Sequence, residues 1–189
     1  MTIFLILAPF GAYSLLMLVT SATISVFAGA AVCIGTIALD VARGRSIKIL
    51  AAGSAIVFAG IGIYLMLLKP SISNSAVSLA VDSGVFAISL GSILLRSPFT
   101  LQYALEAVPA ETAALPGFLR TNYVIAAAWT VAALLMMLAN AAVIYVPGLP
   151  IWAVILIAFT ARNSAVYFTK WYRKTKYSTP RANALPKTH

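Results

Sequence analysis

RSPFTLQYALEAVPAETAALPGFLR, residues 96–120, is the stretch that decides the fold. It is the one long polar interval between apolar blocks, and it carries Glu106 and Glu111, two of the four acidic residues of the chain. Long hydrophobic segments lie on both sides of it. Since such segments match a bilayer core better than water, we interpret the stretch as a membrane-surface connector between two sets of transmembrane helices.

The composition excludes an ordinary soluble domain. The chain has 189 residues, of which 62% are hydrophobic and 9% charged, and its mean hydropathy is +0.99. A soluble protein of this size needs far more charge on its surface. The sequence therefore predicts an all-α, polytopic transmembrane helical bundle.

The apolar blocks predict about six spans, because each is close to the roughly 20 residues that cross a bilayer core as a helix. They cover residues 3–19, 21–39, 47–68, 75–95, 121–146 and 151–168. Residues 3–39 are too long for one span, although a single tilted span with a surface helix, five spans in all, stays open. Residues 1–174 form the membrane domain, and we expect residues 175–189 to be a basic, disordered tail.

Basic residues set the predicted orientation. The net charge is +9, and with six spans most of the basic residues share one side of the membrane. That side holds Arg43, Arg45, Lys48, Arg96, Arg120, Lys170, Arg173, Lys174, Lys176, Arg181 and Lys187, against Lys69 on the other. The positive-inside rule then places both termini in the cytoplasm, and the basic tail meets anionic lipid headgroups. We expect no nucleic-acid partner.

The connector is expected to contain a short helix on the cytoplasmic membrane surface. Ser97 caps it and Pro98 fits its first turn. Its predicted apolar face consists of Leu101, Ala104, Leu105 and Val108, with Gln102 and Glu106 pointing away. Pro109 stops this helix, and a second turn is expected from Ala110 to Leu115.

No catalytic residue, metal site or cofactor is predicted. Glu106 and Glu111 resemble an acid–base pair, but the only histidine is His189 and no metal-ligand set accompanies them. We interpret the two acids as solvated charges that offset Arg96 and Arg120. The protein is therefore not expected to be an enzyme.

The fourth span carries a polar face. Its members recur at steps of three and four residues and are Ser75, Ser78, Asp82, Ser89 and Ser92, with Val85 at the missing step. The serines suit helix packing. Asp82 is different, because a carboxylate inside a span is costly and marks a functional site by default.

Arg162 is the second ionisable group inside an apolar block. We hypothesise that Asp82 and Arg162 pair inside the bundle with Asn163 beside them, since each would otherwise be a lone charge in hydrocarbon. In the alternative, Arg162 extends toward the cytoplasmic headgroups. The candidate intramembrane polar site comprises Asp82, Arg162, Asn163, Ser78 and Ser89.

Small residues in the third span predict close helix packing. Ala51, Ala55 and Ala59 recur every four residues. Further small positions are Gly53, Gly60 and Gly62. Such a seam lets a neighbouring helix approach closely.

The order of these features resembles a known family. A span ends at Lys69-Pro70, and the connector carries Pro116, Phe118 and Arg120 and leads into Asn122 and Trp129. This resembles the bacterial inner-membrane proteins called intracellular septation protein A and related small membrane proteins. The resemblance implies an inner-membrane protein linked to envelope integrity or cell division, without a known active site.

Two function classes follow. In the first, the chain is a non-catalytic component that packs against other envelope proteins or against its own copies. In the second, it is a small transporter or channel in which Asp82 and the serine face line a path. The two classes differ in whether Asp82 faces a cavity or a packed seam.

Overall fold

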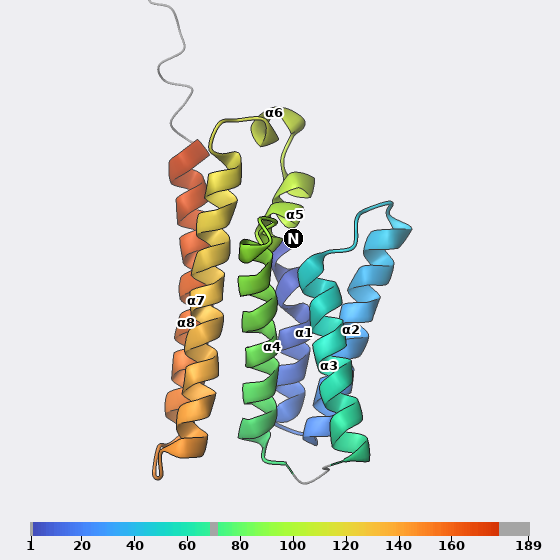
Figure 1. The fold of residues 1–189 in the computed structure, drawn as a ribbon, viewed down its shortest axis with the longest axis vertical. Coiled ribbons are helices and arrows are strands. Elements are labelled where there is room, and N and C mark those ends of the chain that lie inside the picture. Colours follow the sequence, from blue (N-terminus) through green and yellow to red (C-terminus); the bar gives the residue numbers. More distant parts are fainter. Residues whose placement is uncertain (1, 69–71, 178–189) are drawn as a thin grey trace, which may run out of the picture.

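The computed structural model describes residues 2–68 and 72–177. Within these residues all regular secondary structure is α-helical, and turns and loops connect the helices. The helices are α1 (Thr2–Met17), α2 (Ala22–Ala42), α3 (Ile49–Leu67), α4 (Asn74–Leu94), α5 (Phe99–Ala107), α6 (Ala110–Ala113), α7 (Phe118–Tyr145) and α8 (Ile151–Tyr177). The predicted all-α bundle is thereby confirmed. The long helices α1, α2, α3, α4, α7 and α8 run alternately in opposite directions (Figure 1).

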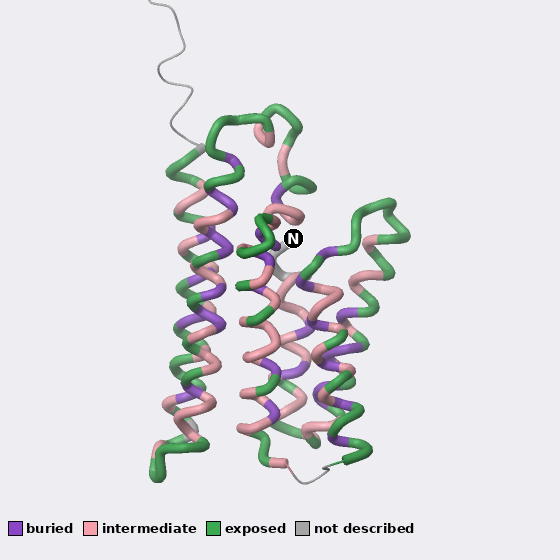
Figure 2. The backbone as a smooth tube through the Cα atoms, viewed as in Figure 1, coloured by how far each residue is buried: buried purple, intermediate pink, exposed green. Residues whose placement is uncertain are grey.

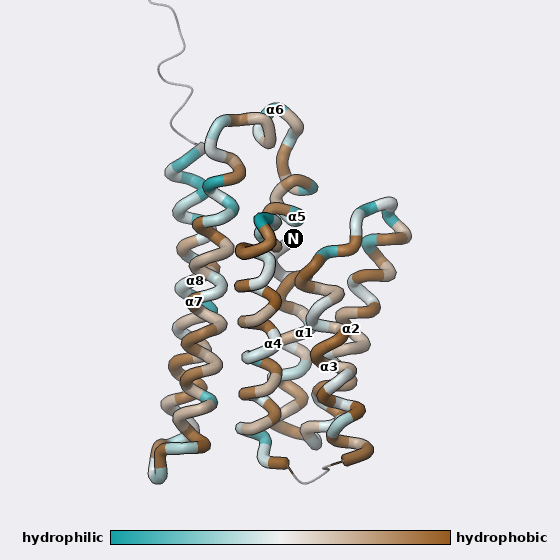
Figure 3. Tube along the Cα trace, viewed as in Figure 1, coloured by the Kyte–Doolittle hydropathy of each residue, from teal (hydrophilic) through white to brown (hydrophobic). Residues whose placement is uncertain are grey.

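Both ends of the described chain lie at the same end of the bundle as α5 and α6 (Figure 1). We call this the connector end, and the opposite end the far end. Figure 3 shows hydrophobic positions along all the long helices and hydrophilic positions gathered at the connector end of α7 and α8. The predicted basic tail begins inside α8, which continues to Tyr177, and its remainder lies outside the described residues, as do Lys69 and Pro70.

Five helices, α2, α3, α4, α7 and α8, are long and apolar enough to cross a membrane. Residues 3–39 form two helices, as predicted, because the chain breaks before Ser21. The Ser21 hydroxyl accepts a hydrogen bond from the amide of Ile24 at 3.3 Å and so caps α2. The 16 residues of α1 give it a length of about 24 Å, shorter than a typical hydrocarbon core.

Glycines let α3 approach both of its neighbours. A Cβ added to Gly62 would lie 2.9 Å from the ring of Phe27 on α2, and one added to Gly84 would lie 2.6 Å from Val57 on α3. The same holds for Gly29 against Phe58 and for Gly53 against Ile88. The predicted seam is thus used at Gly53 and Gly62, whereas Gly60 faces open space.

The core of α1–α4 is built around Phe58, which is fully buried. The rings of Phe10 and Tyr13 on α1 lie 5.8 Å and 5.4 Å from the Phe58 ring, centroid to centroid. Cys33 is buried in the same cluster, as a small apolar residue would be. These contacts hold α1 inside the bundle.

The second half of the bundle is the α7/α8 hairpin, which joins the first half through α4. Helix α7 packs against α4 on one side and α8 on the other. Figure 2 shows exposed positions recurring along α2, α3, α4, α7 and α8. On α8 these are large apolar side chains such as Trp152, Leu156 and Phe159. An apolar outer surface of this kind suits lipid as the solvent.

The predicted apolar face of the connector helix is only partly used in packing: Ala104 is buried, whereas Leu101 and Val108 are half-buried. Phe99, Thr100 and Ala104 are the buried residues of α5, whereas Leu105 is 51% exposed. The helix also begins at Phe99 with no side-chain cap from Ser97. Its first amide instead donates to the hydroxyl of Ser92, at 3.1 Å, which ties α5 to the end of α4. Helix α5 is therefore packed onto α7 and α4 rather than held by an apolar stripe of leucines.

Candidate functional site

Asp82 lies on α4 and faces α7. Its carboxylate accepts a hydrogen bond from Nδ2 of Asn140 at 2.8 Å, and the same nitrogen lies 3.3 Å from the carbonyl oxygen of Met136. Asp82 is eight residues beyond Asn74, about 12 Å along the helix axis from its start. The carboxylate thus sits well inside the span and has a fixed partner, Asn140, that we did not assign to it from the sequence.

Asp82 and Arg162 line one small cavity. Its volume is about 50 Å³, and Trp129 and Ser89 contribute to its wall. Space of this size admits only a few water molecules. The charges of Asp82 and Arg162 interact across it, but within the described residues the ion pairs shorter than 4.0 Å lie elsewhere. The two residues therefore share a cavity without forming a direct pair.

The other members of the predicted polar site are divided. Ser89 is buried against the cavity, and Ser78 lies 3.0 Å from the hydroxyl of Tyr13 on α1. Asn163 is exposed, and its side chain donates to the carbonyl oxygen of Phe159 at 2.8 Å. The expectation that Asn163 joins Asp82 is wrong, because one residue further along a helix turns the side chain by about 100°.

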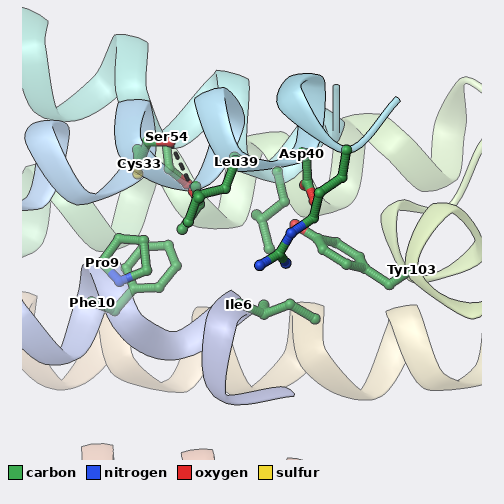
Figure 4. A pocket seen from close by; sticks show the side chains of 12 residues that line it. Ile6, Pro9, Phe10, Cys33, Leu39, Asp40, Ser54 and Tyr103 are labelled. Carbon is green, nitrogen blue, oxygen red and sulfur yellow. Dashed lines mark hydrogen bonds between the residues drawn. The ribbon is translucent and has the colours of Figure 1, made fainter. Parts of the chain in front are cut away.

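Three cavities meet at Ile6 on α1. The Asp82 cavity shares Ile6 and Leu50 with a second cavity of about 40 Å³ that reaches Asp40 near the connector end. In Figure 4, Ile6 and Phe10 face Cys33, Leu39 and Asp40 across this second cavity, with Tyr103 at one side. A third cavity of about 50 Å³ also touches Ile6 and extends to Thr169 and Arg173.

The second cavity is suited to water. The hydroxyl of Ser54 lies on its wall, is buried, and has no hydrogen-bond partner among the described residues. A buried polar atom of this kind is normally satisfied by an ordered water. Ile6 and Leu50 therefore separate a polar space near the connector end from the space around Asp82.

A second polar cluster holds the connector in place, and we call it the connector lock: Asp40, Arg45, Lys48, Gln102 and Glu106. Lys48 is only 2% exposed and lies 2.5 Å from the carboxylate of Glu106 and 3.5 Å from that of Asp40. Arg45 lies 3.9 Å from each of the two acids. Ion pairs at these distances offset the cost of removing Lys48 from water.

Helix α5 also completes the start of α3. The Ile49 amide, one of the unpaired amides at the start of α3, donates to Oε1 of Gln102 at 2.8 Å. The ammonium of Lys48 lies 6.0 Å from the centre of the Tyr103 ring. Burial raises the pKa of the Tyr103 phenol, and the nearby acids Asp40 and Glu106 raise it further. The connector is thus fixed to the α2–α3 loop by several polar contacts.

These contacts correct the interpretation of the connector charges. Glu106 does not offset Arg96 or Arg120, since its partners are Lys48 and Arg45. Arg96 is exposed and adopts a positive φ of 58° where α4 ends. Glu111 is exposed in the first turn of α6, and Arg120 is exposed near the start of α7. The sequence contained one usable signal for the lock, a lysine between two isoleucines, Ile47 and Ile49.

Two of the residues that carry the resemblance, Asn122 and Trp129, take part in hydrogen bonds inside the bundle. The side chain of Asn122, 1% exposed, donates to the carbonyl oxygen of Phe118 at 2.9 Å. The Thr100 hydroxyl donates to the carbonyl oxygen of Asn122 at 2.8 Å. Trp129 Nε1 donates to the hydroxyl of Thr169 at 3.1 Å. Together they join α5, α7 and α8 at the connector end.

Across residues 2–68 and 72–177, no three His, Cys, Asp or Glu side chains gather as metal ligands would. No protein-family model, curated protein or solved structure matches the chain. The interior polar site is therefore interpreted from its own geometry.

Proposed function

We propose that this chain is a multi-pass protein of a bacterial inner membrane that takes up a proton at Asp82 and passes it between the two sides of the bilayer. The observation that carries the proposal is that Asp82, deep in α4, borders a small cavity together with Arg162. Ionisable groups at this depth in a membrane mark ion or proton paths by default.

The surroundings of Asp82 favour a proton over a metal cation. Arg162 lines the same cavity and would repel a second positive charge. Neutral Asp82 would still receive the amide hydrogen bond of Asn140, because a carboxylic acid keeps an acceptor oxygen. Proton uptake thus changes the charge of the site while its hydrogen-bonded geometry is kept.

The orientation follows from the basic residues. Those in the described loops and helix ends, including Arg43, Arg45 and Lys174, lie at the connector end, which the positive-inside rule assigns to the cytoplasm. In this arrangement the cavity that reaches Asp40 opens toward the cytoplasm. Ile6 and Leu50 line both cavities and lie between this one and the cavity at Asp82.

The test is proton uptake by liposomes that contain the full chain and a trapped pH-sensitive dye. A potassium gradient with valinomycin supplies the driving potential. We expect uptake by the wild type, its loss in Asp82→Asn, and wild-type uptake in Glu111→Gln, which makes the same acid-to-amide change on the exposed α6. Wild-type uptake by a folded Asp82→Asn variant would refute the proposal.

A second candidate is a non-catalytic envelope component associated with septation. One observation favours it: two residues that carry the resemblance contact the connector. The carbonyl oxygen of Asn122 accepts from Thr100 on α5, and Trp129 packs against the cluster that contains Phe99, so the connector offers a fixed surface. Its test is capture of the full chain from native membranes in mild detergent. Division or envelope proteins should co-purify with the wild type and with Asp82→Asn alike, which separates this role from the first.

A further inference from the structure

The outer face of the α7/α8 hairpin carries one continuous groove. At the connector end, a cleft of about 550 Å³ is lined by Arg120, Tyr172 and Lys176, among others. Next to it, an apolar groove of about 570 Å³ is lined by small residues that include Ala128, Ala132, Ser164 and Ala165. We call the two parts together the hairpin groove.

Helical periodicity makes the two parts a single feature. On α7 the lining residues step by three or four positions, through Gly117, Arg120, Val124, Ala128, Val131 and Leu135. On α8 they step in the same way, through Lys176, Tyr172, Phe168, Ala165, Ala161 and Ile157. Residues at these steps share one face of a helix. The charged cleft therefore leads directly into the apolar groove.

The cleft is positively charged and its walls include no acidic residue. Neither Arg120 nor Lys176 has a carboxylate within 4.0 Å among the described residues, in contrast to Lys48 and Arg45. Lys176 lies 5.8 Å from the centre of the Tyr172 ring. Tyrosine beside lysine is a common arrangement at the headgroup level of a membrane.

The apolar part has the length of one lipid leaflet. On α8 the apolar part runs from Leu156 to Phe168, twelve positions apart, which is about 18 Å of helix, slightly more than half of a hydrocarbon core of about 30 Å. The alanines along it leave room between the two helices. An extended acyl chain lying there would have its polar end at Arg120 and Lys176.

We propose that the hairpin groove binds one anionic phospholipid, with its phosphate between Arg120 and Lys176 and an acyl chain along the alanines. Basic clefts between helices on the cytoplasmic side suit anionic headgroups. A second copy of the chain fits less well, because copies inserted in the same orientation would bring the same positive clefts together. Free phosphate would leave the apolar groove unused.

The site is tested on the full chain in a neutral detergent by native mass spectrometry and thermal unfolding, with dioleoyl phosphatidylglycerol as the probe. Dioleoyl phosphatidylcholine and inorganic phosphate are the comparison arms. We expect one phosphatidylglycerol to stay bound and to raise Tm, and neither comparison arm to do so. Equal binding of phosphatidylcholine would overturn the charge assignment, and equal stabilisation by phosphate would overturn the lipid assignment.

Charge-removing variants locate the headgroup part of the site. Arg120→Gln and Lys176→Gln are each expected to weaken phosphatidylglycerol binding roughly 5-fold, and both together about 30-fold. Lys174→Gln removes the same charge from α8 away from the cleft and should change binding less than about 2-fold. If Lys174→Gln weakened binding as much as Lys176→Gln, the attraction would be general and the proposal would fail.

Ala128→Leu fills the apolar groove, whereas Ala127→Leu adds the same volume at an exposed position that does not line it. Only the first should reduce retention of phosphatidylglycerol. If Ala128→Leu retained the lipid while it shifted a concentration-dependent dimer toward monomer, the groove would be an interface between copies, which would also overturn the proposal.

Discussion

The connector lock and the Asp82 cavity both remove charged side chains from water, but they treat those charges differently. In the lock, Lys48 and Arg45 meet Asp40 and Glu106 at 2.5–3.9 Å. In the interior, Asp82 and Arg162 face a shared cavity without a pair shorter than 4.0 Å. Charges that neutralise one another directly hold helices together, whereas the charges kept apart around the cavity are those to which we assign proton uptake in our proposal.

The largest effect is expected when the lock is broken on one side. Lys48→Met leaves Glu106 and Asp40 facing each other without their main cation. Because the side chains of these acids are 25% and 20% exposed, we expect a loss of about 2–4 kcal/mol, less than for a fully buried pair. The measurement is the free energy of unfolding in detergent micelles. Combining Lys48→Met with Glu106→Leu should recover part of the loss. If the single variant were as stable as the wild type, the lock would not be structural.

A smaller loss is expected at the seam that positions α4. Gly84→Ala would bring a Cβ to 2.6 Å from Val57, and overpacking of this kind costs about 1–3 kcal/mol. Gly91→Ala is the control on the same helix, because a Cβ there meets no atom within 4 Å. The measurement is the free energy of unfolding of both variants in one detergent. If Gly84→Ala were as stable as Gly91→Ala, α3 and α4 would be less closely packed than the structure shows.

The interior site should contribute less to stability than either of these. Asn140→Ala removes the amide that holds Asp82, and hydrogen bonds inside membrane proteins average about 0.6 kcal/mol, with a maximum near 1.7. Proton uptake by the variant should nonetheless change, because the carboxylate loses its fixed position. If Asn140→Ala lost as much stability as Lys48→Met, the Asp82 site would stabilise the fold as strongly as the connector lock does, and the contrast between them would fail.

The smallest effect concerns pH at the connector. The pKa of Tyr103 is raised in the folded chain by burial, so its contribution to stability is complete below the unfolded value of about 10 and is lost as pH rises above it. Unfolding at pH 8 and at pH 11 should therefore show a steeper loss for the wild type than for Tyr103→Phe. Equal slopes would mean that the phenol is accessible to water.

Much of the architecture was predictable because its signals are local. The apolar blocks and the break near Ser21 indicate six long helices, and the structure has them within three residues of the expected bounds, except that α8 continues to Tyr177, past the expected end at residue 168. The predicted polar face of α4 is confirmed in part, because Asp82 and Ser89 line the same cavity. The partner of Asp82 was not predictable, because Asn140 lies 58 positions away in the chain.

The connector shows the limit of periodicity. Leu101, Ala104, Leu105 and Val108 suggested an apolar face, yet of these only Ala104 is buried, and Phe99 and Thr100 are buried beside it. A short helix can turn either face to a neighbour when both contain apolar residues. Here Glu106 and Gln102 on one side reach Lys48 and the start of α3, and these polar contacts set the rotation of α5.

The sequence by itself determined that this is a helical membrane bundle, where its helices lie and which of its ends is basic, because hydrophobic length and charge are properties of each segment alone. Only the tertiary structure decided that Asp82 meets Asn140 and shares a cavity with Arg162, and that Glu106 belongs to Lys48. Such partners depend on the depth and rotation of each helix relative to the others, and these are set by packing across the whole bundle.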